Sequence, residues 1–281
     1  MYNLVMILTL IIFIIALLFW IYLIALLPNL SRKHLMKPYE SVYIAHRGLF
    51  NNKDIPENSL KAFRKAVRNN YGIELDVQLT TDNKLVVFHD ESLKRMTGID
   101  KKLYQCSYDE INELKLLNTK ETIPLFEDVL KVLKKDTPLI IEIKPEGRPI
   151  DTTKATVALM RDYEGLYNME SFDPNVVRYL RKNEPEIIRG QLSQNYFNED
   201  SNLNALLKFI LTNTLLNFYT RPDYIAYDCL NTSNLSFRIL SKLYKAECVA
   251  WTIKSQEQLE NNKQFYKCFI FDSFIPKEKI N

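Results

Sequence analysis

The sequence predicts an α/β protein, a (β/α)₈ TIM barrel preceded by one transmembrane helix. Two observations carry this prediction. An apolar run without any charge occupies residues 4–27, and from residue 41 onward short β-branched or apolar runs alternate with helical patterns. Alternation of strands and helices at this spacing is typical of a parallel sheet, either doubly wound or closed into a barrel.

The number of strands selects between these two folds. The candidate strands are VYIAH, IELDV, LVVFH, LIIEIK, YNMESF, IIRGQL, YIAYDC, CVAWTI and CFIFDS. Only residues 79–84 join the second strand to the third, which is too short for a parallel crossover, so these two should form an antiparallel hairpin. Eight strands then remain for the parallel sheet, which suits a closed barrel. Helical patterns lie between them at 59–69, 125–135, 153–163, 174–182, 203–218, 235–245 and 255–264.

Three regions follow from these patterns. A transmembrane helix is predicted at residues 4–27, a juxtamembrane linker at 28–41 and the barrel domain at 42–281. Residues of about 91–124 fit neither a strand nor a helix pattern, and we expect them to form a small insertion above the barrel. No glycine-rich phosphate-binding motif follows any strand, which weakens the nucleotide-binding alternatives.

The apolar run has the length of a membrane span. Its 24 residues contain no charge, and as a helix they would extend about 36 Å, enough to cross a bilayer with some tilt. A cleaved signal peptide is the rival interpretation, but the run is too long and lacks a basic start, and LPNLS is a poor cleavage site. We therefore predict a retained single-pass membrane anchor.

The charges that flank the span predict its orientation. Arg32, Lys33 and Lys37 follow it, and no charged side chain precedes it. The positive-inside rule then places the barrel in the cytoplasm and residues 1–3 outside.

Composition excludes several classes of partner and site. The net charge is only +3 and the basic residues are scattered, so no nucleic-acid partner is expected. The four cysteines are far apart without a CxxC pair, which argues against a zinc site and against a disulfide framework. We interpret them as core thiols in a reducing compartment.

Ionisable residues gather at the ends of the predicted strands. In a barrel the C-terminal ends of the strands carry the functional side chains. Each residue has a structural interpretation when taken alone: a strand-end histidine can be hydrogen-bonded, Glu142 and Lys144 can form an ion pair, and Asp90 and Asp173 can cap the segments after them. The complete set at these ends is His46, Arg47, Glu74, Asp76, His89, Asp90, Glu142, Lys144, Asp173, Trp251 and Asp272.

Three acids in this set indicate a metal site. Glu74 and Asp76 lie two apart on one strand and so share a face, and Glu142 follows on the next parallel strand. Three carboxylates on adjacent strands resist joint burial unless a cation holds them. Oxygen ligands without a nearby thiol favour one divalent cation, Ca²⁺ or Mg²⁺, over Zn²⁺.

The remaining groups indicate phosphate chemistry. His46 and His89 flank the acids, and two imidazoles can divide the work of a general base and a general acid. Arg47 and Lys144 add positive charge of the kind that binds a phosphate. The sequence does not assign the roles of base and acid to one histidine or the other.

Several motifs resemble those of the glycerophosphodiester phosphodiesterase family. They are AHRG at 45–48, PENS at 56–59, ELDVQLTTDNKLVVFHD at 74–90, IEIKP at 141–145 and AWT at 250–252. The resemblance runs from about residue 42 to the C-terminus. It implies a TIM barrel of the phospholipase C-like phosphodiesterase type, with a small insertion after the HD strand. It also implies a divalent cation and cleavage of a glycerol phosphodiester into glycerol 3-phosphate and an alcohol.

Position by position, the resemblance also implies roles. His46 and His89 match the family's acid/base pair. Trp251 matches an aromatic at the mouth of the pocket, although a buried core tryptophan fits the sequence equally well. The metal ligands of the family match Glu74, Asp76 and Glu142, and its phosphate contacts match Arg47 and Lys144.

Two further matches carry no predicted catalytic role. Glu57 and Asn58 match an ENT/ENS signature, but they equally suit the start of the following helix, since Asn is a favoured N-cap. The closing strand, FIFDSFIP, departs from the family pattern and keeps only Asp272 and a trailing proline.

The predicted function is metal-dependent hydrolysis of glycerophosphodiesters by a membrane-anchored enzyme. Two alternatives stay open. One is a lysophospholipase D-type phospholipase acting at the bilayer, and the other is an inactive barrel that serves as a membrane-tethered binding module. The expected partners are a glycerophosphodiester or lysophospholipid substrate and the membrane.

Overall fold

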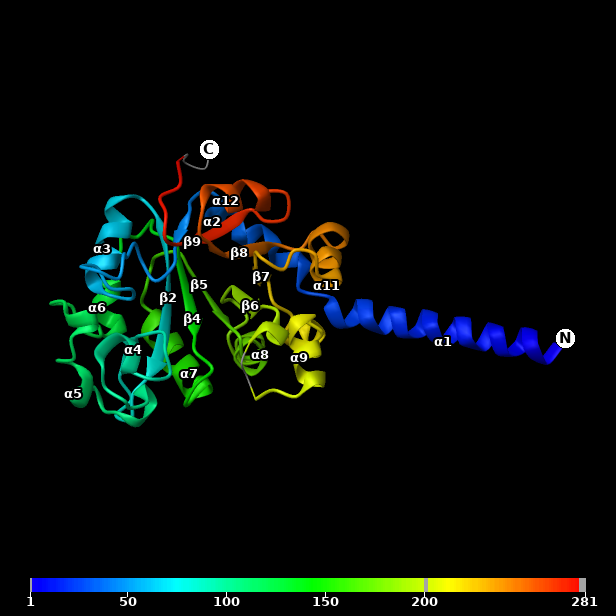
Figure 1. Cartoon of the computed structure of the whole chain (residues 1–281), viewed down its shortest axis with the longest axis horizontal. Coiled ribbons are helices and arrows are strands. Elements are labelled where there is room, and N and C mark those ends of the chain that lie inside the picture. The colour runs from blue at the N-terminus through cyan, green and yellow to red at the C-terminus, as the bar shows by residue number, and fades with distance from the viewer. Residues whose placement is uncertain (1, 200–201, 278–281) are drawn as a thin grey trace.

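A long N-terminal helix projects from a closed α/β barrel in the computed structural model, which describes residues 2–199 and 202–277 (Figure 1). The helix, α1 (Tyr2–Leu26), runs away from the barrel alone. Residues 278–281, the end of the predicted barrel region, lie outside the described residues, as does residue 1.

The parallel strands close into a barrel. Its strands are β1 (Ile44–Ala45), β2 (Gly72–Leu79), β4 (Leu139–Ile143), β5 (Tyr167–Ser171), β6 (Arg189–Ser193), β7 (Tyr224–Asp228), β8 (Cys248–Ile253) and β9 (Cys268–Phe271). Each pairs in parallel with its neighbours, and β1 pairs with both β9 and β2, so no edge is left. β3 (Leu85–Val87) pairs with β2 antiparallel. The predicted eight-stranded barrel and the predicted hairpin are both confirmed.

Helices surround the barrel (Figure 1). They are α3 (Leu60–Arg68), α6 (Phe126–Leu130), α7 (Pro149–Met160), α8 (Pro174–Asn183), α9 (Ala205–Thr212), α10 (Asn217–Thr220), α11 (Leu235–Arg238) with its π-turn continuation (Ile239–Leu243), and α12 (Gln256–Asn262). The single helix predicted over 203–218 is divided, because Thr214 takes a positive φ of 50° that an α-helix does not allow. The others begin and end close to their predicted positions, although α6 is much shorter than the pattern over 125–135.

Alternation along the strands sorts the side chains into an outer and an inner set. Outward residues such as Ile73, Leu75 and Ile141 pack under the helices in the main core. Inward residues near the N-terminal end of the barrel are apolar, among them Ile44, Ile140, Tyr224 and Cys268. The charged residues therefore occupy the other end of the interior, towards the C-termini of the strands.

The segment before the barrel closes its apolar end. Residues 30–40 form a 3₁₀-helix (Leu30–Met36) followed by α2 (Lys37–Glu40). Met36 and Tyr39 are almost fully buried within the inner apolar cluster. The sequence predicts a juxtamembrane linker at 28–41, whereas in the structure these residues pack as part of the barrel because two large apolar side chains fill its open end.

The region of the predicted insertion has a small core of its own. It contains α4 (Lys94–Thr97), a 3₁₀ turn (Leu103–Gln105), α5 (Tyr108–Ile111) and a second 3₁₀ turn (Leu116–Asn118). Leu93, Met96, Leu103 and Ile111 pack there against Phe88, which follows β3. In Figure 1 these short helices lie together beside β2, away from α1.

The helix α1 is apolar on every side and largely exposed. Its large apolar side chains from Leu4 to Ile21 are each about half exposed or more, and Leu26 at its end is buried. By length and composition α1 could cross a membrane, and an N-terminal signal sequence would meet the same criteria.

Candidate active site

Three acids of the inner layer meet at the C-terminal side of the barrel. Glu74 and Asp76 point inward from β2, and Glu142 does so from β4, where it is the register partner of Asp76. One oxygen from each carboxyl group lies within 4.8 Å of the others, and all three side chains are buried. The structure thus brings together the three residues that the sequence predicts as metal ligands.

Burial and mutual repulsion act differently on these acids. Burial, together with the charges of Asp76 and Glu142, raises the pKa of Glu74 well above its usual range. The pKa of Glu142 is also raised, chiefly by burial and against the opposing charge of Lys144. Burial also acts to raise the pKa of Asp76, but the charges of His89, Lys144 and Arg47 outweigh it and lower that pKa.

Two basic side chains reach this cluster. Lys144 Nζ lies 2.8 Å from Glu142 Oε1 and 3.5 Å from Asp76 Oδ1. Burial acts to lower the pKa of Lys144, but the charges of Glu142 and Asp76 raise it overall, so the ammonium stays charged. Arg47 Nε lies 3.4 Å from Asp76 Oδ2, and the backbone N–H of Arg47 donates to Glu74 Oε2 at 2.9 Å.

The donor set fits a divalent cation. All three candidate ligands are carboxylates, and Asp76 Oδ1 is buried without a hydrogen-bond partner among the described residues. Oxygen donors of this kind suit hard cations. A second group, Glu57, His89 and Asp90, also has potential ligand atoms within 4.8 Å of one another. Arg95 forms ion pairs with both acids of that group, so little of their negative charge remains to bind a metal.

Each histidine of the site is held by a carboxylate. His46 Nδ1 lies 2.9 Å from Asp272 Oδ2, and His89 Nδ1 lies 2.7 Å from Asp90 Oδ1. Because an ionised carboxylate only accepts, each Nδ1 donates its proton and each Nε2 is left as the basic nitrogen. His46 Nε2 lies 4.0 Å from Glu74 Oε2, at the edge of the acid cluster.

Burial and the charge of Arg47 lower the pKa of His46 even though Asp272 opposes them. These effects favour the neutral form of the His46 imidazole. The sequence predicts no catalytic role for Asp272 and only a capping role for Asp90. In the sequence, only the position of Asp272 directly after a strand and that of Asp90 beside His89 indicate that these residues could belong to the site.

The PENS segment at residues 56–59 forms hydrogen bonds with residues of the site. Glu57 Oε1 accepts from Arg47 at 2.7 Å and from Arg95 at 2.6 Å. Asn58 Nδ2 donates to Asp76 Oδ2 at 2.8 Å. The side chain of Ser59 caps α3, so the N-cap interpretation of Asn58 is wrong. Both Glu57 and Asn58 are instead tied to residues of the site.

Both histidines, Arg47, Glu74 and Glu142 line one cavity of about 230 Å³. Trp251 lines it and meets Phe172 edge to face, with their ring centroids 5.4 Å apart. Trp251 therefore lies at the pocket, as one of the two sequence interpretations expects. The lining residues are His46, Arg47, Glu74, His89, Glu142, Glu170, Phe172, Leu192, Trp251, Thr252, Lys254 and Ile270.

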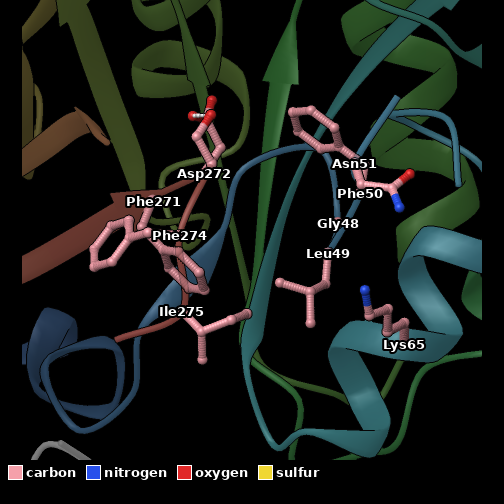
Figure 2. A pocket seen from close by; sticks show the side chains of 10 residues that line it. Gly48, Leu49, Phe50, Asn51, Lys65, Phe271, Asp272, Phe274 and Ile275 are labelled. Atoms are coloured by element: carbon pink, nitrogen blue, oxygen red, sulfur yellow. Dashed lines mark hydrogen bonds between the residues drawn. The ribbon is translucent and has the colours of Figure 1, made fainter. Parts of the chain in front are cut away.

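A larger cavity of about 440 Å³ lies next to the site but does not contain its chemistry (Figure 2). Figure 2 shows Asp272, Phe271 and Phe274 on one side of this cavity and Lys65 on the other, near Leu49. It shares only Asp272 with the groups described above and includes neither histidine nor any of the three clustered acids. The smaller cavity is therefore the candidate active site.

Glu170 is a further acid in the cavity that sequence reasoning did not identify. It faces inward from β5 as the register partner of Glu142, and burial raises its pKa to about 8. Tyr224 Oη lies 2.8 Å from Glu170 Oε2. Gly190 makes room for this tyrosine, because a Cβ there would come within 2.2 Å of Tyr224 Cζ. Only the barrel register places these residues together.

Several curated proteins are similar to this chain in sequence. Human glycerophosphodiester phosphodiesterase 1 is 30% identical over 175 residues, which are 57% of this chain and 52% of the human protein. This chain thus spans about half the length of that relative. The putative glycerophosphodiester phosphodiesterase YhdW of Bacillus subtilis is 28% identical over 224 residues, 76% of this chain and 86% of the relative.

Solved structures share the fold. A phosphodiesterase of Oleispira antarctica, in complex with the product sn-glycerol-3-phosphate, matches 84% of this chain and 95% of its own with a TM-score of 0.66 at 23% identity. A glycerophosphodiester phosphodiesterase of Thermotoga maritima matches 83% of this chain and 94% of its own chain, with a TM-score of 0.64 at 24% identity. Residues 46–273 match the family as a whole, and they include the acids, both histidines and their carboxylate partners. The chain belongs to the glycerophosphoryl diester phosphodiesterase family.

Proposed function

We propose that this protein is a phosphodiesterase that cleaves a glycerophosphodiester into glycerol 3-phosphate and an alcohol. One observation carries the proposal: Glu74, Glu142, Arg47 and two carboxylate-held imidazoles line a single cavity, and Asp76 and Lys144 lie against its acids. Family membership supports the same reaction class.

The residues of the site have separable roles in this reaction. Arg47 and Lys144 bind the non-bridging phosphoryl oxygens and balance the charge that develops on them. Glu74, Asp76 and Glu142 hold a Ca²⁺ or Mg²⁺ ion, which supplies Lewis-acid polarisation of a phosphoryl oxygen when bound.

The two histidines move the protons. One Nε2 takes the proton of a glycerol hydroxyl as its oxygen bonds to phosphorus, and the other gives a proton to the alcohol oxygen as its bond to phosphorus breaks. Water then opens the resulting cyclic phosphate, with the two imidazoles exchanging roles, and glycerol 3-phosphate is released.

The difference in exposure favours His46 as the base of the first step. The side chain of His46 is 16% exposed and contacts the acid cluster, whereas that of His89 is 32% exposed. A departing alcohol leaves towards solvent, so its proton donor should be the imidazole nearer the rim.

The test is a panel of phosphodiesters assayed with each cation. Purified protein with Ca²⁺ or Mg²⁺ should release glycerol 3-phosphate from glycerophosphocholine or glycerophosphoethanolamine, and chelation should abolish the release. Full activity after exhaustive chelation would contradict the metal assignment. Inactivity on the whole panel would instead favour the catalytically inactive binding module.

A lysophospholipase D-type activity is the second candidate. Phe172, Leu192 and Trp251 form an apolar wall in the cavity, which suits a substrate with an alkyl chain. Comparing kcat/KM for glycerophosphocholine with that for lysophosphatidylcholine separates the two. A preference of tenfold or more for the lysophospholipid would make it the main activity.

We also propose that α1 is a retained anchor that holds the barrel on the cytoplasmic side of the cell membrane. Its uncharged length supports a span, and Arg32, Lys33 and Lys37 directly after it support the orientation.

A further inference from the structure

We propose that the barrel itself docks on the surface of an anionic membrane through the face that surrounds the end of α1. This face, here the root surface, consists of exposed side chains of α9, α10, α11 and the π-turn after α11. The inference rests on the proposed anchoring by α1. It adds a second contact between this protein and lipid.

The end of α1 leaves no spacer between the span and the barrel. Tyr22 Oη lies 2.7 Å from Ser236 Oγ in α11, and Tyr244 Oη donates to the carbonyl oxygen of Leu23 at 2.8 Å. Asn217 Nδ2 in α10 donates to the carbonyl oxygen of Leu26 at 3.0 Å. The barrel therefore holds the last turn of α1 from two sides.

The length of α1 brings the bilayer to the same level. About 20 helical residues are needed to cross about 30 Å of hydrocarbon. Counted from Asn3, that length ends near Tyr22, where contact with the barrel begins. The root surface must then lie in or next to the headgroup region.

Large apolar side chains are exposed on this surface. Figure 1 shows α9 and α11 on either side of the point where α1 leaves the barrel. The four elements of the root surface, α9, α10, α11 and the π-turn, carry five large apolar side chains that are each about half exposed or more. They are Leu206 (69%), Phe209 (48%), Phe218 (50%), Leu235 (65%) and Leu243 (62%). Exposed apolar side chains concentrated in neighbouring elements are typical of an interaction site.

The charges of the root surface are of one sign. Residues 202–222 and 229–246 contain no Asp or Glu, although the whole chain has 34 in 281 residues. Lys208, Arg238 and Lys242 belong to the elements of the root surface, and Arg221 and Lys245 follow shortly after α10 and the π-turn. Apolar side chains combined with basic ones are the composition that binds the interface of anionic bilayers. This charge pattern, and continuity with α1, favour lipid over a second protein as the occupant.

The test measures how strongly a spin-labelled lipid in the bilayer quenches a fluorophore attached to the full-length protein. The native cysteines are all buried, between 1% and 4% exposed, so a cysteine introduced on the surface can be labelled selectively. Leu206→Cys and Leu235→Cys would carry an environment-sensitive fluorophore, with the protein reconstituted in phosphatidylcholine–phosphatidylglycerol vesicles that contain doxyl-labelled lipid. Ile99→Cys in the insertion region is the matched control, because Ile99 is also an exposed apolar residue, at 44%.

Labels at positions 206 and 235 should be quenched at least twofold more than the label at position 99. Equal quenching at the three positions would overturn the docking. Exchange of phosphatidylglycerol for phosphatidylcholine, or the variant Lys242→Glu/Lys245→Glu, should reduce the quenching, and an unchanged signal would overturn the anionic-lipid preference. A signal at position 206 that depends on protein concentration and not on lipid would assign the face to a second copy and also overturn the proposal.

A label within α1 separates this inference from the anchor on which it rests. Ile12→Cys lies near the middle of the span and should be strongly quenched. Quenching at position 12 without quenching at 206 and 235 would reject docking and leave the anchor standing. No quenching at position 12 would reject the anchor and the docking together. Hydrolysis of a soluble glycerophosphodiester should be unchanged in every labelled variant and reports on the active site independently.

Discussion

At the scale of single residues, the pairing of each imidazole with a carboxylate prepares both for proton transfer. Asp272 and Asp90 orient His46 and His89 through Nδ1 and leave each Nε2 for the substrate. A fixed tautomer removes the need to select one at the moment of reaction. The two histidines should therefore differ in role because of their position and not because of their own hydrogen bonding.

This difference predicts how two variants respond to the leaving group. His46→Ala and His89→Ala should each lower kcat about 10²-fold or more with a choline diester, the usual scale for loss of a general acid or base. With the p-nitrophenyl phosphodiester of glycerol, whose leaving group departs without a proton, His89→Ala should recover most of the rate of p-nitrophenolate release, which reports on the first step alone. His46→Ala should not recover. Rescue of His46→Ala in place of His89→Ala would reverse the assignment.

The three acids predict a separate effect on the metal. Glu142→Gln removes one charge from the cluster, so the concentration of Ca²⁺ or Mg²⁺ required for half-maximal activity should rise about tenfold or more, within the range known when a metal site is weakened. At saturating metal much of kcat should return, since Glu142 is not a proton donor in the reaction. Metal titrations of both activity and binding would measure this, and an unchanged midpoint in either would contradict the ligand role.

At the scale of elements, the loop between β1 and α3 connects the barrel to its insertion. Glu57 in this loop binds Arg47 at the site and Arg95 in α4. Although burial raises the pKa of Glu57, the bonds and charges of Arg95 and Arg47 lower it to about 2, from a usual value of 4.5. This one carboxylate therefore connects the two ends of the loop with each other and with α4.

That connection predicts a stability that depends on pH. The folded-state pKa of Glu57 lies below its unfolded value, so its contribution is complete above about pH 4.5 and is lost as the pH falls towards 2. Glu57→Gln should lower the free energy of unfolding by about 2–3 kcal/mol at pH 7, and the difference from the parent should shrink on acidification. Urea denaturation between pH 7 and pH 3 would measure this.

An exposed ion pair provides the control. Glu164 pairs with Lys135, but both side chains are more than 70% exposed. Glu164→Gln should change the stability by less than about 0.5 kcal/mol. A constant difference between Glu57→Gln and the parent across the pH range would show that the carboxylate charge is not what stabilises the loop.

At the scale of the whole molecule, the barrel and the proposed span form one structure. Hydrogen bonds from α10, α11 and Tyr244 hold the end of α1, and Met36 and Tyr39 then close the barrel interior. Reorientation of the barrel relative to α1 would break these contacts. The contacts therefore fix the direction in which α1 leaves the barrel.

Protease accessibility tests the predicted side. With a tag at the C-terminus, the tag should survive protease added to intact spheroplasts and disappear once the membrane is opened. The basis is the charge step at Arg32 and Lys33, which favours retention of the barrel in the cytoplasm. Loss of the tag from intact spheroplasts would place the barrel outside.

Much of the fold and the acid cluster could be predicted from local patterns. The short connection at 79–84 predicts a hairpin, and the remaining strand count favours a closed barrel; both features are present in the structure. The spacing of Glu74 and Asp76 placed them on one face because side chains alternate along any strand. Periodicity and connection length are properties of short stretches of chain, so these features need no knowledge of distant segments.

Tertiary structure alone decided which distant residues complete the site. Asp272 reaches His46 because β9 closes against β1, Glu170 meets Tyr224 across Gly190, and Met36 fills the barrel from a segment that resembles a linker. None of these contacts has a signature in its own stretch of sequence. Each depends on barrel register and closure, which arise from the pairing of all the strands together and from the packing that this pairing allows.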